Sequence, residues 1–141
     1  MKRVFIIHRW DGTPQSDWYQ SVAGSLKQNS FEVIIPAMPN SSHPKINSWI
    51  FKLKEISLNP NKETYFIGHS VGCQTILRYL QELPEKTKVG KIVFVAPWFH
   101  LQNLENKESE KIIQPWLETP IDFDKINNHI TKLTAIFSDN D

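Results

Sequence analysis

Two spacings of apolar residues alternate along the chain. Short runs rich in β-branched and aromatic residues predict strands, and longer segments with apolar residues three or four positions apart predict helices. The expected strands are Val4 to Ile7, Phe31 to Ile35, Thr64 to Ile67, Lys91 to Val95 and Leu133 to Phe137. The expected helices cover residues 16–28, 44–57, 73–83, 109–113 and 122–130. Ser16 is expected to cap the first helix, and Pro44 to stand in the first turn of the second.

Strands that alternate with helices predict an α/β fold. We expect a three-layer α/β/α sandwich with a mainly parallel sheet of about five strands, because helical connections place helices on both faces of such a sheet. The strands are nearly continuous apolar runs, as strands buried on both faces are. Ligands of such sheets bind beyond the carboxyl ends of the strands, so the residues that follow each strand are the candidates for a site.

Composition narrows the class of protein further. The chain has 141 residues, the size of one domain, and 16 basic against 15 acidic residues give a net charge of +1. That balance supplies no field for nucleic acid. The single cysteine, Cys73, excludes an internal disulfide, and the longest near-apolar run, Ile92 to Phe99, is too short to span a membrane. We therefore expect a soluble, cytoplasmic, single-domain protein with no nucleic-acid partner and no membrane span.

One motif carries chemistry. Gly68-His69-Ser70-Val71-Gly72 fits G-x-S-x-G between a predicted strand and a predicted helix, which is the setting of a nucleophile elbow. The turn is so sharp that the residues two before and two after the serine must be small, and the serine hydroxyl is raised above the sheet. A glycine-rich turn with an incidental serine is the competing interpretation. Motifs for metal or nucleotide binding are missing, so no cofactor and no metal is expected.

Three segments resemble small α/β-hydrolases of the YdeN-like and retinoblastoma-binding-protein-9-like serine hydrolases. They are residues 6–14 with Trp18, residues 65–73 around the motif, and residues 120–126 leading to 135–141. The resemblance is colinear over almost the whole chain. It implies an α/β-hydrolase fold and a serine hydrolase that cleaves a small carboxylic ester, thioester or amide through an acyl-enzyme, with a small-molecule acyl substrate as its partner.

The resemblance also implies roles for particular residues. Ser70 is the expected nucleophile, and the backbone N–H groups of Val71 and, by analogy, Trp10 are the expected oxyanion donors. Asp141, the last aspartate of its turn, is the expected acid, with Asp139 as the alternate. Many relatives carry glycine where Arg9 stands, and this arginine either binds an acidic substrate group or is solvated.

The general base is the difficulty. In α/β-hydrolases the histidine follows the acid in the chain, and here no residue follows Asp141. His100 is the best substitute, since it follows the fourth strand at the same edge of the sheet. His8 is expected to brace the oxyanion loop and His69 to be structural. His43 and His129 are expected at the surface.

Two readings of the whole chain follow from the missing base. In the first, residues 1–141 are the larger part of one hydrolase domain and stop before its final strand, histidine loop and closing helix. In the second, the chain is a non-catalytic ligand- or protein-binding domain on a hydrolase scaffold. Trp98 and Trp116 either wall an acyl pocket or pack in the core, and Cys73 is expected to be a buried thiol. Protein partners and oligomeric state are left open.

Overall fold

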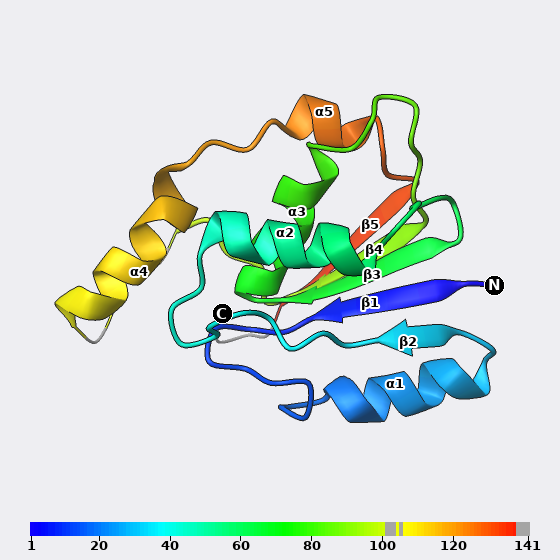
Figure 1. The fold of residues 1–141 in the computed structure, drawn as a ribbon, viewed down its shortest axis with the longest axis horizontal. Helices are drawn as coiled ribbons and strands as arrows, with labels where there is room; N and C mark the ends of the chain where they lie inside the picture. The colour runs from blue at the N-terminus through cyan, green and yellow to red at the C-terminus, as the bar shows by residue number, and fades with distance from the viewer. Residues whose placement is uncertain (101–103, 105, 138–141) are drawn as a thin grey trace.

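A five-stranded parallel sheet forms the centre of the structure, a computed structural model that describes residues 1–100, 104 and 106–137. The strands are β1 (Arg3–Ile7), β2 (Glu32–Ile34), β3 (Thr64–His69), β4 (Lys91–Val95) and β5 (Lys132–Ile136). Their order across the sheet is β2-β1-β3-β4-β5, and every pair is parallel (Figure 1). The prediction of an α/β fold with about five parallel strands is confirmed.

Among the described residues, five helices connect the strands. They are α1 (Tyr19–Gln28), α2 (Ile46–Ile56), α3 (Val71–Leu80), α4 (Lys107–Glu118) and α5 (Phe123–Asn127). Alternate residues of β1 serve the two faces of the sheet, since side chains of a strand alternate in direction. Phe5 and Ile7 belong to the large core cluster with α2 and α3, whereas Val4 and Ile6 pack with Tyr19 of α1 on the opposite face. Figure 1 shows α1 apart from α2 and α3, across the sheet.

The helices on the two faces of the sheet do not cover β5. All five residues of β5 are exposed, and Ile136 retains 52% of its accessible surface. The expectation that every strand is buried on both faces is therefore wrong for β5. The physical reason is position: β5 is the edge of the sheet, while α1 packs beside β2 at the other edge.

α1 and α2 begin two to three residues later than predicted. α1 begins at Tyr19 with Trp18 at the N-cap, and Ser16 Oγ instead accepts a hydrogen bond from the Thr13 N–H at 2.9 Å. Pro44 precedes the N-cap of α2, Lys45, rather than standing in its first turn.

The segment before α5 is more helical than predicted. α4 runs for 12 residues around Pro115, where the sequence predicted only 109–113. The Asn106 side chain caps the helix by accepting from the Ser109 N–H at 2.8 Å, and burial of Ile113 and Trp116 favours the extra turns. α5, in contrast, ends at Asn127, earlier than predicted.

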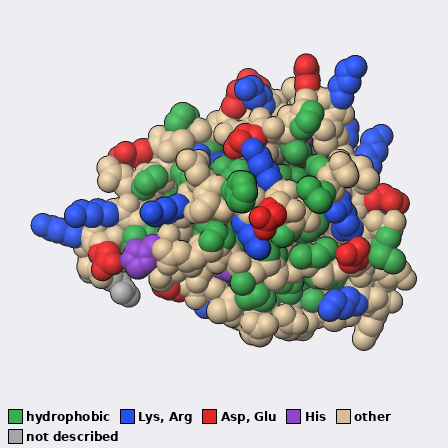
Figure 2. Space-filling view, in the orientation of Figure 1, with side chains coloured by type: hydrophobic (Ala, Val, Ile, Leu, Met, Phe, Trp, Pro, Cys, Tyr) green, Lys and Arg blue, Asp and Glu red, His purple; other side chains and the backbone are tan. Residues whose placement is uncertain are grey.

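Charges of both signs share the face of the molecule that Figure 2 draws. Figure 2 shows basic and acidic side chains interspersed over one face of the molecule, with apolar groups between them. No helix among the described residues has the length and apolar character needed to cross a membrane.

Candidate active site

Ser70 stands at the turn between β3 and α3 in a conformation that L-residues rarely adopt. Its φ is 56° and its ψ is −119°. Two backbone hydrogen bonds hold it there: the Ser70 N–H donates to the Val95 carbonyl at 3.0 Å, and the Ser70 carbonyl accepts from the Cys73 N–H at 3.0 Å. The first of these bonds joins the turn to the end of β4. The surrounding sheet thus imposes the strained conformation on the serine.

The two glycines of the motif are required by close packing. A Cβ on Gly72 would lie 2.2 Å from the Ile7 carbonyl oxygen, and a Cβ on Gly68 would lie 2.8 Å from Cys73 Cα. Neither glycine has a positive φ, so the requirement is space and not backbone freedom. The start of α3 therefore packs directly on the end of β1. This is the steric demand that the motif predicts.

Trp98 contacts the serine hydroxyl. Its indole Nε1–H donates to Ser70 Oγ at 2.7 Å, and its carbonyl accepts from Gln74 Nε2 at 3.0 Å. Trp116, the other tryptophan of this region, is 1% exposed and donates its indole N–H to the Pro44 carbonyl. Of the two interpretations left open for these residues, Trp116 is part of the core, and Trp98 lies at the candidate nucleophile.

The Trp10 backbone N–H has no hydrogen-bond acceptor among the described residues, although the N–H groups on either side of it do. On either side of it, the Arg9 N–H donates to the Tyr19 hydroxyl at 3.0 Å and the Asp11 N–H donates to the Ser41 carbonyl at 2.8 Å. The structure gives the Trp10 and Val71 N–H groups no acceptor within the described part of the chain. These are the two groups predicted to receive an oxyanion.

His8 braces the loop that follows β1. The Met38 N–H donates to His8 Nε2 at 3.0 Å, so the ring proton lies on Nδ1, which donates to the Arg9 carbonyl at 2.8 Å. The side chain is fully buried, and burial lowers the pKa of this histidine below 6.5. His8 is thus a neutral structural residue with both ring nitrogens occupied.

We expect this burial to make folding stability depend on pH. Below pH about 6.5, His8 is protonated in the unfolded chain but stays neutral in the folded chain, because burial lowers its pKa in the folded state. The free energy of unfolding therefore falls by up to about 1.4 kcal/mol per pH unit until the pH reaches the lowered pKa of the folded state. Urea denaturation at pH 7.5 and 5.5 measures this loss. His8→Gln provides the control, because its amide can accept and donate as the ring does but does not titrate. Equal pH dependence of the two proteins would contradict the assignment.

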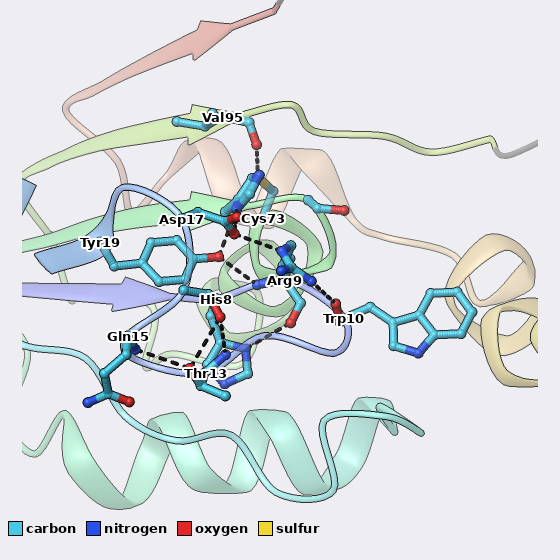
Figure 3. A network of polar contacts seen from close by, with 12 residues as sticks. His8, Arg9, Trp10, Thr13, Gln15, Asp17, Tyr19, Cys73 and Val95 are labelled. Carbon is cyan, nitrogen blue, oxygen red and sulfur yellow. Dashed lines mark hydrogen bonds and ion pairs between the residues drawn. The ribbon is translucent and has the colours of Figure 1, made fainter.

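Arg9 is held in an ion pair. Its Nε donates to Asp17 Oδ2 at 2.7 Å and its terminal nitrogen donates to the Trp10 carbonyl at 3.0 Å (Figure 3). The side chain keeps 36% of its accessible surface, so Arg9 is a paired surface residue, and a contact with an acidic substrate group stays a prediction. The bond to Asp17 raises the pKa of Arg9. Tyr19 supports the same loop, since its hydroxyl accepts from the Arg9 N–H and lies 2.7 Å from His69 Nδ1. Burial raises the pKa of Tyr19 to about 12, so its hydroxyl stays protonated.

The remaining histidines lie in different surroundings. His43 is half exposed and paired with Glu108, whereas His129 is 2% exposed and contacts the Thr87 carbonyl at 2.7 Å, so the prediction that His129 is exposed is wrong. His129 is buried because its ring and backbone join the end of α5 to the segment before β4. His100 is exposed.

No base for Ser70 is found among these rings. In the described portion of the chain, the rings of His8, His43, His100 and His129 make no hydrogen bond to Ser70 Oγ. The substitute role expected for His100 therefore has no supporting contact in the structure.

The predicted acids, Asp139 and Asp141, lie outside the described residues. The strand before them ends beside the site, because the Ala96 N–H donates to the Ile136 carbonyl at 2.9 Å where β4 and β5 finish.

Cys73 does not compete as a nucleophile. Burial raises the pKa of its thiol, and Sγ lies 3.6 Å from the Val95 carbonyl. Within residues 1–100, 104 and 106–137, no group of three or more His, Cys, Asp or Glu side chains is arranged to hold a metal ion.

Together, the parallel sheet and the strained serine at the strand–helix turn define the class as an α/β-hydrolase-type protein. The profile of the Serine hydrolase family matches residues 4–141, and the chain belongs to that family. A curated relative, "Putative hydrolase YdeN" of Bacillus subtilis (strain 168), is 30% identical over 95 residues, which is 67% of this chain. The match spans half of that relative's length.

A solved structure has the same fold as this chain. The crystal structure of the ydeN gene product from B. subtilis superposes with a TM-score of 0.89 at 24% identity, covering 100% of this chain and 73% of the solved one. The similarity bears on the fold of the described chain.

Proposed function

We propose that this protein is a serine hydrolase that cleaves a small carboxylic ester, or a thioester or amide, through an acyl-enzyme on Ser70. The observation that carries the proposal is the strained serine at the turn from β3 into α3, with φ 56°. Natural proteins retain such strain chiefly where function uses it. Membership of the Serine hydrolase family supports the same chemistry.

In the proposed reaction, Ser70 Oγ attacks the substrate carbonyl carbon while a general base takes its proton. The carbonyl oxygen becomes an oxyanion, which the uncommitted N–H groups of Val71 and Trp10 stabilise, and the positive end of α3 adds to this. The leaving group departs with the proton as the tetrahedral intermediate collapses. Water then attacks the acyl carbon and gives a proton to the base. The carboxylic acid product leaves as that proton passes from the base to Ser70 Oγ.

The proposal assigns the nucleophile and the oxyanion donors to described residues. Asp141 remains the proposed acid that orients the base, with Asp139 as the alternate. His100 remains the substitute base proposed from the sequence, and no hydrogen bond among the described residues joins its ring to Ser70 Oγ. A small-molecule acyl substrate is the proposed partner. The cytoplasmic location and the lack of a nucleic-acid partner stay predictions.

A fluorophosphonate probe tests the proposal, because such a probe forms a covalent bond with an activated serine. The folded full-length protein is expected to gain one adduct, and mass spectrometry of its peptides is expected to place the adduct on Ser70. Ser42→Ala is the matched control: it removes an exposed serine from the loop beside Trp10 and should leave labelling unchanged. A folded full-length protein without an adduct on Ser70 would favour the non-catalytic binding domain instead.

A further inference from the structure

We propose that Trp98 takes part in the reaction: its indole N–H holds Ser70 Oγ in place and stabilises the negative charge that develops on that oxygen. This inference rests on the proposed function, because it concerns the same nucleophile. No motif in the sequence points to this contact. It depends on the fold, which brings the segment after β4 across the turn between β3 and α3.

The direction of the hydrogen bond is unambiguous. An indole nitrogen can only donate, so Ser70 Oγ is the acceptor of the 2.7 Å bond. One lone pair of the oxygen is thereby used, and the rotamer of the serine is fixed. The serine's own proton must then point away from Trp98. It is left for a base on the other side of the hydroxyl.

The backbone of Trp98 is anchored by the helix that begins at the nucleophile. Gln74, four residues after Ser70, donates from Nε2 to the Trp98 carbonyl at 3.0 Å. Arg78, four residues further on, donates to Gln74 Oε1 from Nε at 3.2 Å and from a terminal nitrogen at 3.0 Å. Both side chains are 1% exposed. A single face of α3 therefore carries the nucleophile and the two residues that hold its hydrogen-bond donor.

Arg78 extends this connection to α4. It donates to the Trp116 carbonyl at 2.9 Å and to the Thr119 carbonyl at 2.8 Å, and its guanidinium lies 5.9 Å from the Trp116 ring. These carbonyls are at the C-terminal end of α4, where the helix dipole favours a positive charge. Buried polar networks of this kind are rigid when every group is satisfied. Trp98 is thus held against Ser70 by a fixed framework.

The donor favours the reacting state over the resting one. As the O–H bond of Ser70 breaks and its proton passes to the base, Oγ gains negative charge, and a hydrogen bond to a charged oxygen is about twice as strong as one to a neutral oxygen. Trp98 keeps its own proton throughout. The same bond assists when the Oγ–carbon bond of the acyl-enzyme breaks, because Oγ again carries charge as it leaves.

Trp98→Phe tests the inference, since it keeps an aromatic ring and removes the donor. We expect about a tenfold lower rate constant for fluorophosphonate labelling of Ser70, and a similar fall in kcat with little change in KM. Trp49→Phe is the matched control, because it also loses an indole hydrogen bond, to the Pro39 carbonyl, but lies outside the framework that holds Trp98. It is expected to lower stability and to leave the labelling rate of the folded protein within about twofold of wild type.

Gln74→Glu separates the anchor from the donor. The carboxylate still accepts from Arg78, but it places an oxygen where Nε2 donated to the Trp98 carbonyl, so Trp98 should shift and labelling should slow while the indole N–H itself remains.

A spectroscopic measurement checks the bond without any reaction. The chain has five tryptophans, and in 15N-labelled protein the indole cross-peak of Trp98 is the one that Trp98→Phe removes. Ser70→Ala is expected to move that cross-peak by removing its acceptor, and to leave the cross-peak that Trp49→Phe removes in place.

The outcomes separate this inference from the proposed function. Wild-type labelling on Ser70 together with an unchanged rate in Trp98→Phe would overturn the role of Trp98 and leave the hydrolase intact. An unmoved Trp98 cross-peak in Ser70→Ala would also overturn it. Absence of any labelling of Ser70 would overturn both. A tenfold slower Trp98→Phe with an unaffected Trp49→Phe supports the role.

Discussion

Replacing Ser70 with alanine is expected to reduce kcat/KM for ester hydrolysis by at least about a thousandfold, because no other described group is placed to form the acyl-enzyme. Folding should hardly change. The only described contact of the serine hydroxyl is the indole bond from Trp98, and one such bond contributes about 1 kcal/mol. Steady-state hydrolysis of a small activated ester and urea denaturation measure the two effects.

Ser70→Gly is the control for backbone strain. Glycine accepts a φ of 56° without penalty, so this variant should be as inactive as the alanine variant and about 1 kcal/mol more stable than it. An alanine variant that keeps more than a tenth of the wild-type kcat/KM would show that Ser70 is not the nucleophile.

Replacing Gly72 with alanine is expected to destabilise the fold by about 3 kcal/mol or more. The added Cβ would lie 2.2 Å from the Ile7 carbonyl oxygen and 2.9 Å from the His8 carbonyl oxygen, and both atoms belong to the backbone at the end of β1, an interior strand of the sheet. Neither can move without separating α3 from β1. Urea denaturation measures the loss, and a variant too unstable to fold agrees with the expectation.

Gly24→Ala is the matched control, and it is expected to stabilise the fold rather than to destabilise it. Gly24 also lies in a helix, α1, but a Cβ there meets no atom within 4 Å. Alanine should stabilise this variant by about 0.5 to 1 kcal/mol through helix propensity. Equal effects of the two substitutions would contradict the packing argument for Gly72.

Local patterns were enough to predict the strands and the turn at Ser70. The β-branched and aromatic run Val4 to Ile7 predicts a strand, and the structure buries it on both faces. Two glycines at fixed distances from a serine specify a turn that a larger residue cannot enter. These features depend on residues close in sequence, so a single sequence reveals them.

Features that depend on distant segments were not predictable. The contact between Trp98 and Ser70 joins residues 28 positions apart, and the burial of His129 depends on the Thr87 carbonyl, 42 positions before it. A tryptophan or a histidine in a polar segment has the same local pattern whether it is exposed, packed or functional. The roles of Asp139, Asp141, Trp10 and Val71 stay predictions.

The position of β1 has a consequence for the order in which the protein can fold during synthesis. β1 is made before the other described strands, yet it lies inside the sheet and pairs with β3, with Arg3 opposite Thr64, 61 positions later. Its apolar side chains cannot find their final neighbours until that distant segment has been translated. Closing so long a loop is slow compared with forming a helix such as α1. Until β3 has been made, the apolar side chains of β1 stay without these partners and can take part in aggregation. Mutations that delay the pairing of β1 with β3 should therefore lower the yield of folded protein before they alter its chemistry.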